Sequence, residues 1–98
     1  MALIGGMDRL RNHYIAEADK FGVNLRVFNE TRADITASIQ HLDVVVIFTG
    51  KVSHLLRNEV MRAARERNIL VLMCHSCGVC SLRHCIACLM DQSLSLKQ

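Results

Sequence analysis

Hydrophobic positions along the chain follow two spacings, one typical of strands and one typical of helices. Short apolar runs occur at four places, and the third run is apolar on both faces, as expected of a central strand in a parallel sheet. The pattern therefore predicts four strands, over Ala2–Ile4, Val23–Phe28, Asp43–Phe48 and Ile69–Met73.

Between and after these runs, apolar residues recur every three or four positions, which is the spacing of one helix face. The predicted helices cover Arg9–Phe21, Ala33–His41, Val52–Arg67 and Val79–Met90. Strict alternation of strands and helices predicts one α/β domain over residues 1–98, with a Rossmann-like or flavodoxin-like fold of about four parallel strands and a cysteine-rich C-terminal helix. So small a sheet leaves edges exposed, so we also expect a homodimer.

Composition narrows the function classes. Half of the residues are apolar and the net charge is only +3, which indicates a folded domain with no strong preference for anionic partners. The basic run Arg57, Arg62, Arg65 and Arg67 fits a solvated helix face better than a nucleic-acid surface, so nucleic acid is not expected as a partner. No signal peptide or membrane-spanning stretch is visible, which predicts a cytoplasmic protein with reduced thiols.

Every cysteine of the chain lies within fifteen consecutive residues, together with two histidines. Buried inert cysteines would explain one or two of them, but not five, and an odd number in a reducing compartment disfavours a disulfide framework. Thiolates and imidazoles are the ligands that bind zinc, copper, iron–sulfur clusters and haem iron. No distant second Cys-x2-Cys pair completes a standard zinc ribbon, so the metal stays open. The segment reads Cys74, His75, Cys77, Cys80, His84, Cys85 and Cys88.

Helical geometry predicts which of these side chains share one face of a helix. If Cys77–Met90 forms one helix, then Cys77, Cys80, His84 and Cys88 share a stripe about 16 Å long, which is longer than one zinc ion can use. Either the turn from Cys74 to Cys80 wraps a metal locally, or the stripe lines a cluster or haem, within one chain or between two. Cys85 lies off the stripe, where a structural thiol would fit. The opposite face, which should pack on the sheet, carries Val79, Leu82, Ile86, Leu89 and Met90.

Three segments of unusual composition follow predicted strands, namely Gly5–Gly6, Thr49–His54 and Cys74–Cys77. Because ligand sites in parallel sheets lie at the carboxyl ends of the strands, we expect one composite site there. The predicted metal ligands are Cys74, Cys77, Cys80, His84, Cys88, His54 and His75. Glycine turns can also hold an anionic part of a cofactor, such as a haem propionate, although tight turns alone would explain them. The candidates for that role are Gly5, Gly6, Gly50, Lys51 and Arg9.

The residues Ile4–Gly6, the strand Val44–Phe48 and above all Val52-Ser53-His54 with its following helix resemble a bacterial family, domain of unknown function 2325, over nearly the whole chain. The resemblance implies a small Rossmann-like domain in which His54 matters. It implies no activity and no catalytic residues. The cysteine-rich segment looks like a feature of a subset of that family.

The leading hypothesis is a protein that binds a metal centre, with iron as haem or an iron–sulfur cluster favoured over zinc, and that acts as a redox or gas sensor, carrier or regulator. A second hypothesis is a thiol–disulfide oxidoreductase that uses Cys77 and Cys80, although the proline-free chain lacks the cis-proline of thioredoxin-like enzymes. A third is an interaction module for a protein partner, stabilised by zinc. Enzymatic activity is therefore not the main expectation.

Overall fold

A computed structural model describes residues 1–29, 38–39 and 42–96 of the chain. Its strands form one parallel sheet in the order β2-β1-β3-β4, which confirms the predicted α/β fold with four parallel strands. This order is that of a flavodoxin-like sheet rather than a Rossmann sheet. The strands are β1 (Ala2–Gly5), β2 (Arg26–Phe28), β3 (Val44–Phe48) and β4 (Leu70–Cys74).

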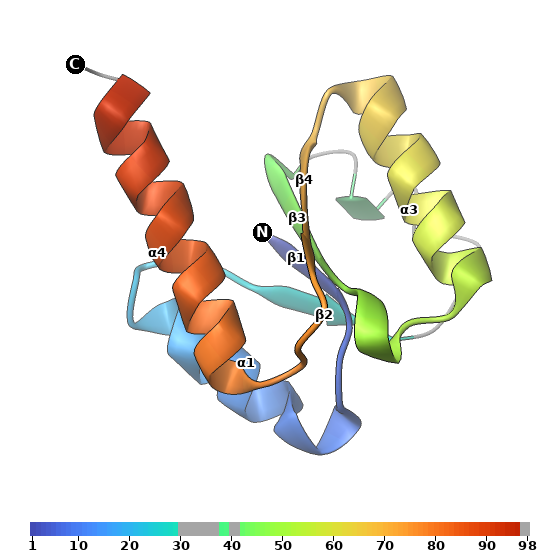
Figure 1. Cartoon of the computed structure of the whole chain (residues 1–98), viewed down its shortest axis with the longest axis horizontal. Helices are drawn as coiled ribbons and strands as arrows, with labels where there is room; N and C mark the ends of the chain where they lie inside the picture. Colours follow the sequence, from blue (N-terminus) through green and yellow to red (C-terminus); the bar gives the residue numbers. More distant parts are fainter. Residues whose placement is uncertain (30–37, 40–41, 97–98) are drawn as a thin grey trace.

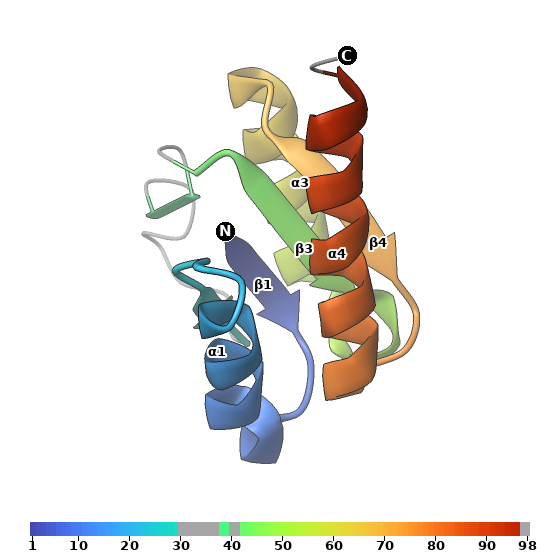
Figure 2. The same cartoon turned by 90° about the vertical axis from the view of Figure 1, so that its left-hand side faces the viewer.

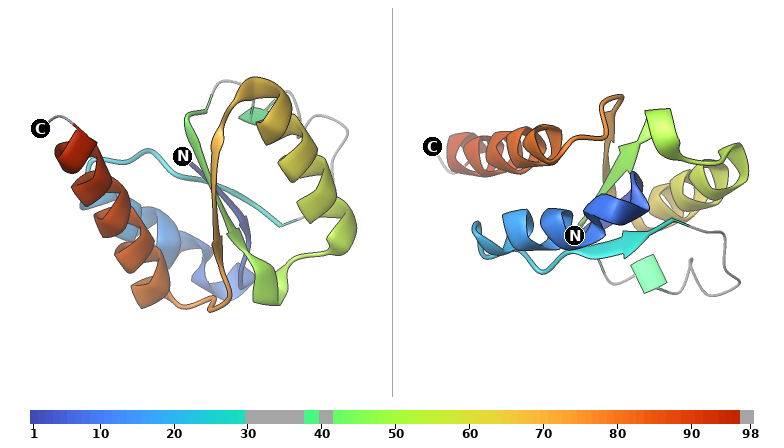
Figure 3. Two further views of the ribbon diagram at one scale, coloured as in Figure 1. Left: turned by 45° about the horizontal axis from the view of Figure 1, so that its top comes forward. Right: turned by 90° about the horizontal axis from the view of Figure 1, so that it is seen from below.

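Helices cover both faces of the sheet. Helix α3 packs on one face, and α1 and α4 lie side by side on the other (Figures 1 and 3). The helix expected over Ala33–His41 lies outside the described residues, apart from Ser38 and Ile39. The described helices are the 3-10 turns η1 (Asp8–Leu10) and η2 (Thr49–Lys51), and the α-helices α1 (Arg11–Asp19), α3 (His54–Arg67) and α4 (Val79–Leu96).

Several element boundaries differ from the predicted ones for local reasons. Strand β2 spans three residues rather than six, because β1 is short and offers register partners only from Arg26 onward. Helix α3 begins at His54, where the Ser53 hydroxyl accepts a hydrogen bond from the Leu56 amide at 3.1 Å as an N-cap. It ends at Asn68, which adopts the left-handed conformation with φ of 57°.

The core consists of two apolar layers separated by the sheet. Alternate residues of β1 and β3 point to opposite faces, so Ile4 and Ile47 pack under α3, whereas Leu3 and Phe48 pack under α1 and α4. Both strands are buried almost throughout, as expected of central strands. Strand β4 is half-exposed because it forms one edge of the described sheet.

Helix α4 is longer than predicted and continues to Leu96, so that its last turns extend away from the sheet (Figures 1 and 2). Leu82 and Ile86 are fully buried against the sheet and α1, as the apolar stripe predicts. Met90, expected on the same face, is 39% exposed.

Candidate metal centre

The three segments that follow strands meet at one edge of the sheet, as predicted. The Gly6 amide donates to the Lys51 carbonyl at 3.0 Å, which joins the turns after β1 and β3. The turn after β4 then lies on Gly50, where a Cβ would stand 2.7 Å from the His75 carbonyl oxygen and 3.7 Å from the Cys77 sulfur. Residues far apart in sequence therefore form one continuous surface beside the cysteines.

Positive backbone angles at Gly5 and Gly6, with φ of 89° and 91°, allow this close packing. A Cβ on Gly5 would lie 2.5 Å from the Lys51 carbonyl oxygen, and one on Gly6 would lie 3.1 Å from the rings of Tyr14 and Phe48. Both glycines are thus explained by tight turns, the simpler of the two interpretations that the sequence leaves open.

Tyr14 fixes the cysteine-bearing turn to the rest of the site. Its hydroxyl donates to the Cys77 carbonyl and accepts from the Met7 amide at 3.3 Å. Its ring is fully buried and makes an edge contact with Phe48, with centroids 5.6 Å apart. The sequence predicts Tyr14 only as an apolar position of a helix, and the role of its hydroxyl was missed.

The cysteines come from two elements that the fold brings together. Cys74 ends β4, Cys77 lies in the following turn, and Cys85 and Cys88 lie on α4. Cys85 lies near enough to Cys74 for that cysteine to help raise its pKa, and the Cys74 thiol donates to the Ser76 carbonyl at 3.4 Å. Cys88 is three residues beyond Cys85 and therefore a neighbour on the helix surface. We call this set of four cysteines the thiol chain; it comprises Cys77, Cys74, Cys85 and Cys88.

Burial and neighbouring cysteines raise the pKa of Cys85 and of Cys77, which keeps these two thiols protonated. Burial, the charge and hydrogen bond of Cys74, and the charge of Cys88 together raise the pKa of Cys85 to about 11. Burial also raises the pKa of Cys77, with a smaller contribution from Cys74, and the nearby Lys51 ammonium opposes both. A cation would relieve the repulsion among the corresponding thiolates.

The expected ligand stripe is shorter than predicted. Helix α4 begins at Val79, so Cys77 precedes it and does not share its outer face. Cys80, His84 and Cys88 do lie on that face and are exposed, with the His84 Nε2 atom 3.7 Å from the Cys88 sulfur. Within residues 1–29, 38–39 and 42–96, no three His, Cys, Asp or Glu side chains already surround one metal position.

The remaining predicted site residues lie around the edge of this cluster. His75 is exposed in the turn after β4, and His54 is exposed at the first position of α3. Arg9 is also exposed, and its guanidinium lies 4.0 Å from the Met7 sulfur. His54 and Arg9 take part in none of the contacts that join the cysteines to the glycine turns.

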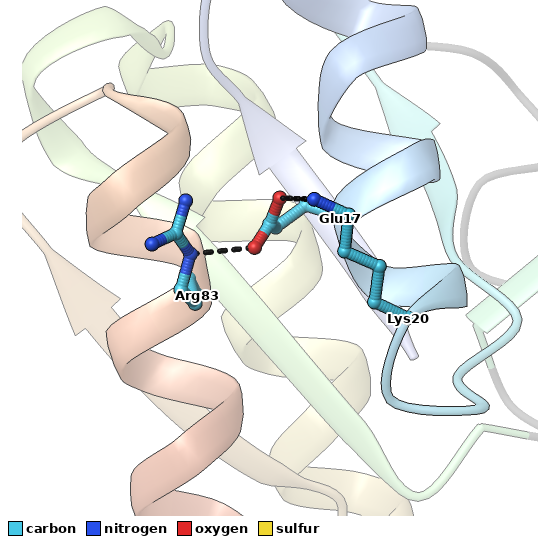
Figure 4. Close-up of polar contacts among 3 residues, drawn as sticks. All are labelled: Glu17, Lys20 and Arg83. Carbon is cyan, nitrogen blue, oxygen red and sulfur yellow. Dashed lines mark hydrogen bonds and ion pairs between the residues drawn. The ribbon is translucent and has the colours of Figure 1, made fainter.

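An ion-pair cluster holds α4 against α1 (Figure 4). The buried carboxylate of Glu17 on α1 accepts from the Arg83 Nε of α4 at 2.5 Å and from the Lys20 ammonium at 3.2 Å. These contacts lower the pKa of Glu17, the hydrogen bond from Arg83 contributing most. Arg83 lies two residues before Cys85, so the pair helps to set where the helix cysteines stand.

Cys85 is the cysteine that sequence reasoning set aside, yet it is the one that contacts Cys74. The signal was present in the spacing, because Cys85 and Cys88 form a second Cys-x2-Cys pair that begins only eight residues after Cys77. This second pair lies so near the first in sequence that the spacing does not match a zinc ribbon, in which the two pairs are farther apart.

A comparison with models of known protein families shows to which family the chain belongs. A family described as uncharacterized proteins conserved in bacteria, domain of unknown function 2325 (DUF2325), matches residues 1–89. The chain belongs to this family. The matched residues include the whole thiol chain of this DUF2325 protein and the turns around it. No curated protein and no solved structure matches the chain. In the part of the chain that the structure describes, no helix is long and apolar enough to span a membrane.

Proposed function

We propose that this DUF2325 protein binds a metal centre through its segment Cys74–Cys88 and acts as a redox or gas sensor, carrier or regulator. The observation that carries the proposal is the gathering of thiols from two elements, since Cys74 ends β4, Cys77 lies in the turn that packs on Gly50, and the remaining cysteines lie on α4. Packing against the core accounts for Cys74 and Cys77 but not for the exposed Cys80 and Cys88, whereas metal binding uses thiols from both elements. Cytoplasmic location is part of the proposal, because reduced thiols persist there.

Iron, as an iron–sulfur cluster or haem, is favoured, and zinc is the alternative. The segment supplies five thiols, one more than a tetrahedral zinc site uses. Iron held by thiolates also provides the chemistry of a sensor, because its oxidation state and external ligands alter the coordination. Metal binding requires the turn between Cys74 and Cys77 to close toward α4, since no three ligands surround one position among the described residues.

The proposal is tested by purifying the full chain without oxygen and recording its absorption spectrum and metal content. Iron or zinc near one equivalent per chain or per dimer is expected for the wild type, with loss of most metal in Cys74→Ser. Ser76→Ala, in the same turn but outside the thiol chain, is the matched control and should retain its metal. A wild-type protein that holds no metal, even after reconstitution with iron and sulfide or with zinc, contradicts the proposal.

Thiol–disulfide chemistry is the second candidate function, and Cys74 and Cys85 are the neighbouring pair for it, with Cys74 as the attacking thiol because burial and its neighbours raise the pKa of Cys85. Cys77 and Cys80 suit this chemistry less well. Cys80 is exposed on the helix, and burial raises the pKa of Cys77, which leaves it a poor nucleophile at neutral pH. Catalytic turnover of a dithiol substrate by metal-free protein would favour this candidate over the metal centre.

A further inference from the structure

A cavity lies between α1 and β2, the edge strand of the described sheet that is farthest from the cysteine-bearing β4 (Figure 3). Its volume is about 310 Å³, close to the lower end of the range of about 300–1,000 Å³ for small-molecule pockets. The polar lining comes from Asp8 after β1, Arg11 at the start of α1, and Arg26 and Asn29 in and after β2. The apolar part of the lining consists of Ile15, Leu25, Val27 and Phe28.

Two guanidinium groups line this cavity from different elements. The Arg11 Nη2 atom donates to the Val27 carbonyl at 3.2 Å, and the guanidinium of Arg26 lies over the Phe28 ring, 5.9 Å from its centroid. These contacts position both side chains but use only part of the N–H donors that each guanidinium carries. Among the described residues, neither guanidinium forms an ion pair with a carboxylate. The cavity therefore offers two positioned cations with donors left for a ligand.

Asn29 supplies a buried acceptor at the same cavity. Its Nδ2 atom donates to a carboxylate oxygen of Asp8, which fixes the orientation of the amide, because the reverse orientation would place two acceptors against each other. The Asn29 Oδ1 atom is buried, and in the part of the chain that the structure describes no group donates to it. Buried acceptors almost always have a donor. This oxygen is thus open to a donor from a bound molecule.

The charges and the acceptors of the lining together select one class of ligand. Two guanidinium groups and one carboxylate give the lining a net charge of +1, so it favours an anion and disfavours an ammonium group. A phosphate has enough oxygens to bind both Arg11 and Arg26, whereas a carboxylate is matched by a single guanidinium. Asn29 and Asp8 then need uncharged donors, and hydroxyl groups meet this requirement.

We propose that this cavity binds a sugar phosphate, with the phosphate on Arg11 and Arg26 and the sugar hydroxyl groups on Asn29 and Asp8. The apolar part of the lining contacts the carbon skeleton of the sugar. The chemistry that the site requires is the ribose phosphate unit, which pentose phosphates and mononucleotides share. The site uses no cysteine and no metal ion, so it adds a small-molecule binding activity to the proposed function and does not depend on it.

Isothermal titration calorimetry of the full chain with ribose 5-phosphate, adenosine monophosphate (AMP), ribose and inorganic phosphate tests the proposal. Ribose 5-phosphate should bind one molecule per chain, and ribose and inorganic phosphate should bind more weakly, because each makes only one of the two sets of contacts. Arg11→Met and Arg26→Met should weaken ribose 5-phosphate binding ~10–100-fold, the usual effect of losing a charged hydrogen bond. Arg9→Met is the matched control, since Arg9 is exposed in the adjoining turn η1 and does not line the cavity.

Asn29→Leu separates the hydroxyl contacts from the phosphate contacts. It should weaken ribose 5-phosphate binding ~10-fold and leave the affinity for inorganic phosphate unchanged. Arg11→Lys keeps the positive charge but loses the planar fork, so it should retain part of the affinity that Arg11→Met loses. Thermal unfolding followed by circular dichroism shows whether each variant is folded.

The proposal is overturned if neither ribose 5-phosphate nor AMP binds to the folded wild type. Equal weakening by Arg9→Met and Arg11→Met would show that the overall charge attracts the ligand and that the cavity does not bind it. If inorganic phosphate binds as tightly as ribose 5-phosphate, or if Asn29→Leu has no effect, the sugar hydroxyl groups play no part and the assignment is wrong. Tighter binding of AMP than of ribose 5-phosphate supports a nucleotide as the source of the ribose phosphate, and the reverse supports a free pentose phosphate.

Discussion

The thiol of Cys85 combines partial burial with two cysteine neighbours, which is unusual for a residue on a helix surface. These neighbours make Cys85 a candidate ligand, although the helical spacing of the sequence did not indicate it. Helical periodicity separates Cys85 from the stripe Cys80, His84 and Cys88, and periodicity cannot show that the end of β4 folds back onto its side of α4. The sequence therefore predicts which segment forms the site and which ligand atoms it offers. It does not predict which side chains lie next to one another.

Cys85 should react slowly with alkylating reagents in the folded, metal-free protein. Its pKa is raised from 9.0 to about 11, so at neutral pH its thiolate fraction falls by about 100-fold relative to an unfolded chain. Iodoacetamide labelling followed by peptide mass spectrometry in native buffer and in urea measures the difference. The native rate should rise with pH until about pH 11. Equal rates in the two conditions would contradict the partial burial of Cys85 beside Cys74 and Cys88.

Gly50→Ala should impair the metal site without disrupting the sheet. The added methyl group would lie 2.7 Å from the His75 carbonyl oxygen, so the turn that carries Cys77 must move away. We expect a loss of stability of ~1–3 kcal/mol and weaker metal binding. Gly78→Ala is the matched control in the same turn, because its methyl group meets only the Ser76 hydroxyl at 3.9 Å. Denaturant unfolding and cobalt affinity measure the two effects; equal metal affinity in both variants would contradict the close packing at Gly50.

At the scale of elements, hydrophobic spacing predicted the strands and most helices well, because apolar runs and periodic stripes coincide with the buried faces. Its errors occur where another element sets the boundary. Strand β2 is short because β1 supplies few register partners, and α3 starts late because η2 packs on the Gly5–Gly6 turn. The position of α4 depends on side chains from α1, which local patterns do not reveal.

The ion pair between Glu17 and Arg83 should make stability pH-dependent at the acidic end. The pKa of Glu17 is lowered in the folded chain, so its contribution is present above 4.5, the unfolded value, and is lost as pH falls through the lower folded pKa. Glu17→Gln should therefore be less stable than the wild type at neutral pH and should approach it at strongly acidic pH. Thermal unfolding of both proteins across this range is the measurement. A difference that stays constant down to the lowest pH would contradict the pairing.

At the scale of the whole molecule, β4 is an edge strand of the described sheet and carries two exposed apolar side chains. Leu70 is 47% exposed and Met73 is 53% exposed, and neither proline nor lysine on β4 protects the edge from pairing. The homodimer expected from the sequence would cover this edge, and a two-fold axis would bring the two copies of β4 together.

If the expected homodimer pairs through β4, Leu70→Lys should shift it to monomer, because a two-fold interface would bring two new positive charges close together. Light scattering after size exclusion over a range of concentrations measures the change. Leu55→Lys is the matched control, since Leu55 is 61% exposed at the start of α3 and lies away from the edge. A wild-type protein that remains monomeric at every concentration, or equal effects of the two variants, would contradict pairing through β4.

The central claim, that the thiols at the end of β4 and on α4 bind a metal ion, is tested most directly by X-ray absorption spectroscopy of the metal-loaded full chain at the iron or zinc edge. The account predicts a first shell that contains sulfur atoms at about 2.3 Å, the usual zinc–thiolate distance. A first shell of nitrogen and oxygen alone, or a chain that takes up no metal to measure, would contradict it.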